Sequence, residues 1–137
     1  MKVFDLHCDT LYKVVTLSHD FSCSDFDVQT DVDFDKYLQC FAVWVPDDLS
    51  VKQGRSLFDK AKSTLIQECK KYDIKLINSL KEIKKSNCKK LGMFTLENCK
   101  IIDNDISYIK YLAESNIKIA TLTWNDKNCI GDGAMVQ

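Results

Sequence analysis

Apolar residues in this chain gather in four runs, and each run is followed by polar or acidic side chains. The runs predict β-strands at about residues 2–8, 37–45, 91–97 and 117–124. The second run is almost continuously apolar, which is typical of parallel strands buried on both faces. The polar groups therefore gather at the carboxyl ends of the predicted strands.

Helical periodicity fills the segments between the later strands. Apolar residues recur at helical spacing between Gln53 and Tyr72. Further on, Asp103 or Asp105 is placed to cap another helix, which Asn116 would end. Strands that alternate with helices predict a parallel sheet with helical crossovers.

The alternation is too short for a closed barrel. A (β/α)8 barrel has eight strand–helix units and typically about 250 residues, whereas this chain has 137 residues and four main strands. An open sheet of four strands would leave both of its edges unprotected. We therefore expect residues 1–137 to form one incomplete α/β domain, the N-terminal half of a (β/α)8 TIM-type barrel, with the remainder of the barrel absent from this chain.

Composition narrows the classes of partner and compartment. The net charge is −1 and the 19 basic residues are dispersed, so no nucleic-acid partner is expected. No apolar run approaches the length of a membrane span, and acidic residues interrupt the N-terminus where a signal peptide would need an apolar core. A cytoplasmic protein with no membrane partner is expected, and the seven dispersed cysteines fit reduced thiols. The exposed edges of a half-barrel make a homo-oligomer possible.

Five aspartates between Asp25 and Asp35 lack the spacing of a calcium loop and favour a polar surface loop.

The end of the first strand carries the first candidate chemistry. Strict alternation places three polar side chains on one face, Asp5, His7 and Asp9. It places three apolar side chains on the packed face, Phe4, Leu6 and Cys8. An adjacent imidazole and carboxylate can bind one divalent metal, although a lone His-x-Asp is more often structural. Alternation also indicates that Cys8 is a buried thiol and no ligand.

Other strand ends can complete such a site. Glu97 ends the third strand, and Trp124 and Asn125 end the fourth. In a parallel barrel these ends converge on one rim, so Glu97 can serve as a third ligand and bridge two metals. An N-cap or a strand-end salt bridge is the alternative role of Glu97.

Together these motifs resemble a known family. Asp5-Leu6-His7-Cys8-Asp9-Thr10, Leu96-Glu97-Asn98 and Thr121-Leu122-Thr123-Trp124-Asn125 are similar, in order and spacing, to motifs of the membrane dipeptidase (renal dipeptidase) family of zinc peptidases. The segment from Gln39 to Trp44 is similar to the family's second strand. The indole at position 124, where many members have histidine, resembles a bacterial branch of the family.

The resemblance implies a (β/α)8 barrel that hydrolyses dipeptides with a metal-activated water at two zinc ions. It assigns His7 and Asp9 to one metal and Glu97 to the bridge between both metals. It makes Glu97 and Trp124 the candidate catalytic residues, and Trp124 with Asn125 the contacts to a dipeptide substrate. Asp5 is a carboxylate that would orient the ligands.

Several family residues have no counterpart in this chain. The resemblance places two further histidine ligands, a proton-transferring aspartate and an arginine for the substrate carboxylate on later strands. The chain alone is therefore expected to be inactive. Another amidohydrolase-like metal hydrolase is a weaker alternative, because such enzymes usually begin with His-x-His. A non-catalytic truncated barrel that assembles with a partner chain is the third interpretation, and in it Trp124 is a packing aromatic.

Overall fold

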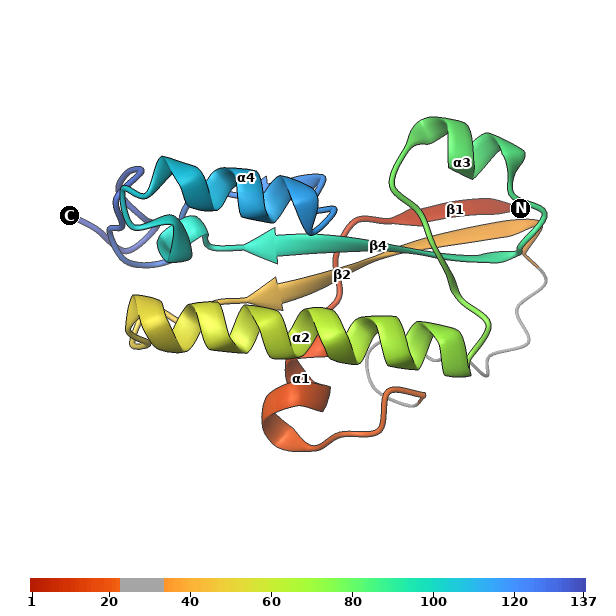
Figure 1. Cartoon of the computed structure of the whole chain (residues 1–137), viewed down its shortest axis with the longest axis horizontal. Helices are drawn as coiled ribbons and strands as arrows, with labels where there is room; N and C mark the ends of the chain where they lie inside the picture. The colour runs from red at the N-terminus through yellow and green to blue at the C-terminus, as the bar shows by residue number, and fades with distance from the viewer. Residues whose placement is uncertain (23–33) are drawn as a thin grey trace.

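The computed structural model describes residues 1–22 and 34–137. The predicted polar loop falls largely on residues 23–33, which lie outside the described residues. Figure 1 shows a curled sheet with the long helix α2 and the short helix α1 against one face. Within the described part, no helix has the length and apolar character needed to cross a membrane.

In the part of the chain that the structure describes, the sheet contains five parallel strands, β1 (Lys2–Asp5), β2 (Lys36–Trp44), β3 (Lys75–Leu76), β4 (Lys90–Glu97) and β5 (Ile119–Thr121). β2 lies between β1 and β4, and the far edge of β4 is shared by β3 near its start and β5 near its end. The predicted parallel sheet is confirmed. The first and fourth predicted strands are longer than the observed β1 and β5.

The connections are α1 (Thr10–Leu17), α2 (Val51–Lys71), α3 (Leu80–Lys85), the short 3-10 helix η1 (Cys99–Ile102) and α4 (Ile106–Glu114). Ser50 and Gln53 form a reciprocal capping box that begins α2. The Asp105 side chain accepts the backbone N–H of Ser107 and so caps α4, as predicted. Asn116, with a φ of 65°, follows the end of that helix in the left-handed region.

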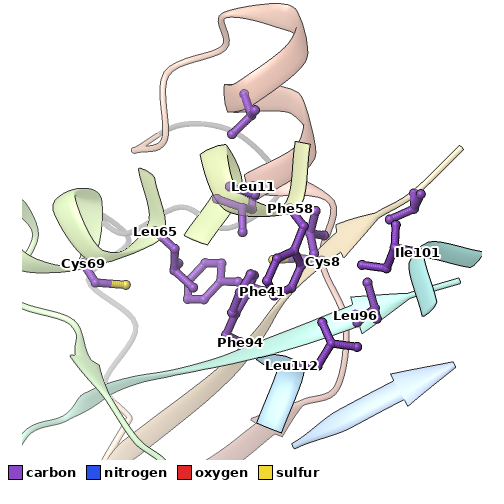
Figure 2. Packing of buried hydrophobic residues seen from close by; sticks show 14 of the residues in the cluster. Cys8, Leu11, Phe41, Phe58, Leu65, Cys69, Phe94, Leu96, Ile101 and Leu112 are labelled. Atoms are coloured by element: carbon purple, nitrogen blue, oxygen red, sulfur yellow. The ribbon is translucent and has the colours of Figure 1, made fainter. Parts of the chain in front are cut away.

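The main core lies between the sheet and helices α1, α2 and α4 (Figure 2). Its centre is aromatic, because Phe58 of α2 stacks on Phe94 of β4 with ring centroids 5.2 Å apart. Phe41 of β2 and Leu65 of α2 are also fully buried. Because β1, β2 and β4 are parallel neighbours in the sheet, their carboxyl ends lie together at one rim.

Candidate metal centre

A one-residue irregularity at the end of β1 decides where the candidate ligands point. Asp5 lies opposite Gln39 in the ladder with β2. Three residues later, the backbone groups of Cys8 bond to residues 40 and 42 at 3.1 and 3.2 Å, so Cys8 lies opposite Phe41. β1 therefore carries one extra residue relative to β2, which is the geometry of a β-bulge.

The bulge reverses the alternation that the sequence predicts. Asp5 and Cys8 now point to the helix-covered face, and Cys8 is buried in the main core as predicted. His7 and Asp9 flank Cys8 and point to the opposite face of the sheet. The prediction that Phe4 and Leu6 pack in the core is wrong, because they are 52% and 61% exposed. The prediction that Asp5 shares a face with His7 is wrong because the bulge places the two side chains on opposite faces of the sheet.

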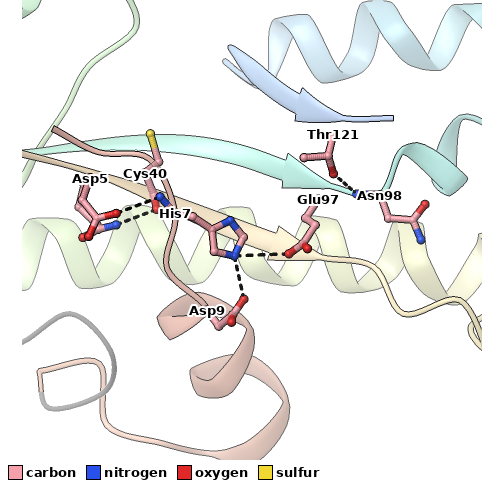
Figure 3. Close-up of polar contacts among 8 residues, drawn as sticks. Asp5, His7, Asp9, Cys40, Glu97, Asn98 and Thr121 are labelled. Atoms are coloured by element: carbon pink, nitrogen blue, oxygen red, sulfur yellow. Dashed lines mark hydrogen bonds and ion pairs between the residues drawn. The ribbon is translucent and has the colours of Figure 1, made fainter. Parts of the chain in front are cut away.

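The structure brings His7, Asp9 and Glu97 together (Figure 3). His7 Nε2 lies 3.2 Å from Asp9 Oδ1 and 3.5 Å from Glu97 Oε2. One potential ligand atom from each residue lies within 4.8 Å of the other two. An imidazole nitrogen with two carboxylate oxygens is a donor set that fits a divalent metal such as zinc.

Asp9 occupies the N-cap position of α1 but does not cap the helix with its side chain. Aspartate is favoured at this position because its carboxylate can accept a backbone N–H of the first turn. Here the carboxylate instead faces His7, while the Asp9 carbonyl accepts the Lys13 N–H at 3.0 Å. The local backbone thus leaves a carboxylate available at the rim.

Glu97 is the most enclosed of the three side chains, at 19% exposed against 47% for His7 and Asp9. Burial raises the pKa of Glu97, the His7 imidazole opposes that rise, and the Asp9 carboxylate adds to it. Two carboxylates that converge on one small volume repel each other, so a cation between them relieves an unfavourable arrangement.

The Asp5 side chain contacts the backbone of His7, and in this way it contacts the candidate site. Its carboxylate accepts the His7 N–H at 3.1 Å and the Tyr37 hydroxyl at 3.3 Å. These bonds brace the bulge on its helix-covered side. Asp5 can therefore orient His7, although it does not lie on the same face as the candidate ligands.

Trp124 and Asn125 reach the same rim beyond β5. The Trp124 ring lies 4.7 Å from that of Trp44, and Trp44 is the register partner of Glu97. The backbone N–H of Asn125 donates to the Asp47 carboxylate at 3.2 Å. The two indoles and the acidic loop after β2 line an open pocket of about 280 Å³.

Sequence reasoning missed two residues at this rim, Trp44 and Asp47. Trp44 ends β2, and its ring also lies 4.8 Å from that of Tyr12. Asp47 follows the same strand end after Pro46. The signal was present, because a polar residue after a buried strand had marked the other strand ends.

The fold and the rim cluster place this chain among α/β-barrel proteins, which carry their functional residues at the carboxyl ends of the strands. The family model of membrane dipeptidase (peptidase family M19) matches residues 1–137. The chain therefore belongs to the membrane dipeptidase family, and the family resemblance found in the sequence is confirmed. No curated protein sequence matches this chain.

Solved structures of dipeptidases share the fold. A metallopeptidase described as dipeptidase AC superposes with a TM-score of 0.72 at 13% identity, covering 91% of this chain and 45% of its own. A metallopeptidase from Rhodobacter sphaeroides, liganded with a phosphinate mimic of the dipeptide L-Ala-D-Ala, also gives 0.72 at 13% identity, covering 93% and 47%. An amidohydrolase from Pseudomonas aeruginosa gives 0.60 at 14% identity, covering 73% and 30%.

These superpositions confirm the predicted fold class, the N-terminal part of a TIM-type barrel. The chain spans about half the length of the two dipeptidase structures, 45% and 47%.

Proposed function

We propose that this chain is the half-barrel that supplies the first ligands of a metal-dependent dipeptidase. The observation that carries the proposal is the convergence of His7, Asp9 and Glu97 within 4.8 Å at the strand ends of a membrane dipeptidase family member. Outside such a site, placing the half-exposed Asp9 carboxylate beside the largely enclosed Glu97 carboxylate would be unfavourable, because like charges repel.

In this proposal His7 and Asp9 would hold one zinc ion, and the Glu97 carboxylate would serve as a ligand to that ion and to a second one. Bound zinc ions would lower the pKa of a shared water and polarise the peptide carbonyl of a dipeptide. The chain's own contribution is to hold the three donors in place. The bulge directs His7 and Asp9, and the end of β4 directs Glu97.

The dipeptide is proposed to lie beside Trp124 and Asn125, in the pocket next to Trp44. The bound phosphinate mimic of L-Ala-D-Ala in the Rhodobacter sphaeroides structure supports a dipeptide as the substrate class. The Trp124 indole can donate one N–H to a substrate oxygen but cannot exchange a proton with it. Proton transfer must therefore come from other groups.

The chain alone is proposed to be inactive. Its only other histidine, His19, follows α1 and lies outside the ligand cluster. Its single arginine, Arg55, donates to the carbonyl oxygens of Ile101 and Ile102 at 2.9 and 3.2 Å, so it is engaged away from any substrate carboxylate.

Zinc titration of the chelator-treated chain by calorimetry tests the metal centre. Glu97→Gln keeps the shape of the side chain but removes its charge, and we expect at least about tenfold weaker zinc binding. Glu114→Gln is the matched control, because Glu114 is 63% exposed on α4. Since all variants keep the same seven cysteines, zinc bound by thiols cancels in the comparison. Equal zinc affinity in the wild type and Glu97→Gln would refute the site.

Hydrolysis of L-Ala-D-Ala tests the second part of the proposal. We expect the zinc-loaded chain to release no alanine, because the remaining ligands and the substrate-carboxylate arginine are missing. Zinc-dependent turnover that Glu97→Gln abolishes would support the metal centre but overturn the claim that the chain is inactive alone.

A further inference from the structure

Three loops at the rim meet at one carboxylate, that of Asp47. Its Oδ1 accepts the side-chain N–H of Asn98, which follows β4, at 2.7 Å. Its Oδ2 accepts the backbone N–H groups of Asn125 and Asp126, beyond β5, at 3.2 and 3.0 Å. The backbone carbonyl of Asp47 also accepts the Lys100 ammonium. Each of these partners is a donor, so the position is chemically matched to a carboxylate.

Asn98 forms the other half of this junction. It is completely buried and has a φ of 73°, in the region that favours glycine. Its side chain donates to the Val45 carbonyl at 2.8 Å and accepts from the Lys100 N–H at 3.2 Å and the Asn128 amide at 3.0 Å. An asparagine is used here because its amide bonds to several loops at once. Asn98 directly follows Glu97, so holding Asn98 also holds the candidate bridging ligand.

The junction determines where Trp124 lies. The two N–H groups bound by Asp47 belong to the residues directly after Trp124. Docking of this backbone sets the Trp124 ring against Trp44, the register partner of Glu97, and forms one wall of the rim pocket. Asp47 is not one of the three clustered donors, so it acts through the residues that it holds.

We propose that Asp47 is a positioning residue, whose carboxylate locks the loop carrying Trp124 onto the loop that follows Glu97. The effect of Asp47 on Glu97 as a metal ligand, and on Trp124 as one wall of the substrate pocket, rests on the proposed function. The docking of the loop does not, and it can be measured separately.

The chain contains two tryptophans, Trp44 and Trp124, and both take part in this contact. Two indoles whose ring centroids lie 4.7 Å apart interact electronically, so the circular dichroism of the indole pair reports docking of the loop. In Asp47→Asn an amide NH₂ faces N–H donors, and we expect the coupled signal to fall by about half or more. Asp48→Asn is the matched control, because it removes the same charge from an exposed neighbour. An unchanged indole signal in Asp47→Asn would overturn the proposal.

Asn98→Gly is the second variant, and it guards against global unfolding of Asp47→Asn. Glycine keeps the positive φ of position 98 while removing the amide that bonds to Asp47. We expect it to lose the indole coupling while its far-ultraviolet helix signal stays intact. Retention of the coupling in Asn98→Gly, combined with unfolding of Asp47→Asn, would assign Asp47 a general structural role and refute the proposal.

Zinc affinity separates the two proposals. If Asp47 positions Glu97, Asp47→Asn should bind zinc about tenfold more weakly, with Asp48→Asn unchanged. If the wild type binds no zinc but Asp47→Asn still loses the indole coupling, the proposed function fails and the loop-docking role stands. If zinc binds at Glu97 and Asp47→Asn leaves both readouts unchanged, the positioning role fails and the metal centre stands.

Discussion

Arg55 should be the most sensitive single anchor of the segment that follows Glu97. It lies on α2, and its guanidinium bonds to the carbonyl oxygens of Ile101 and Ile102 at 2.9 and 3.2 Å. The same group lies 4.0 Å from the centre of the Tyr108 ring and 3.3 Å from Asp105. Arg55 therefore ties the long helix to η1 and to the start of α4.

The expected cost of Arg55→Ala follows from these contacts. Two hydrogen bonds from a charged donor contribute about 1.5 kcal/mol each at the lower end of their range. The cation–π contact adds about 0.5 kcal/mol at this partly exposed position. The ion pair with Asp105 is solvated and contributes little. Alanine has a better helix propensity than arginine by a few tenths of a kcal/mol, which offsets a small part of this loss. We therefore expect Arg55→Ala to lose about 3 kcal/mol of unfolding free energy.

Arg55→Lys should cost about half as much, because an ammonium can reach one carbonyl but cannot reproduce the planar fork. Urea denaturation followed by circular dichroism measures both variants. Lys52→Ala, at an exposed position of the same helix, is the control and should change the stability by less than about 0.5 kcal/mol. A loss in Arg55→Ala no larger than that of Lys52→Ala would refute the anchoring role.

Two further predictions concern the core and the thiols. Phe58→Ala should lose about 3–5 kcal/mol of unfolding free energy in the same urea assay, because it removes a fully buried ring stacked on Phe94. Ile66→Ala is the control, because this position on the same helix is 53% exposed, and it should lose far less. Similar losses in the two variants would contradict the packing of Phe58 in the core. Burial, aided by the nearby Glu68 charge, raises the pKa of Cys69 to about 12. A thiol reacts as its thiolate, so iodoacetamide at about pH 8.5 should modify the exposed Cys129 and spare Cys69 until the chain is unfolded, as peptide mass spectrometry can show. Equal modification of Cys69 and Cys129 in the native chain would contradict the burial of Cys69.

The sequence alone determined the class of fold and the identity of the candidate ligands. Apolar runs separated by helical periodicity define a parallel sheet with crossovers, since buried parallel strands need both faces covered. Chemistry at the ends of those strands follows from the same topology, which is why Glu97 could be linked to His7 across 90 positions of sequence. The motif resemblance then pointed to the family that the comparison confirmed.

The tertiary structure decided the direction of each side chain and the connections among the loops. Strict alternation grouped Asp5 with His7, but the bulge placed them on opposite faces. Whether a strand carries an extra residue depends on its pairing with a neighbour, which local periodicity does not encode. The role of Asp47 was hidden for a similar reason, because its donors lie 51 to 79 residues away in the chain. A carboxylate that gathers distant backbone N–H groups becomes visible only once the strands have brought those loops to one rim.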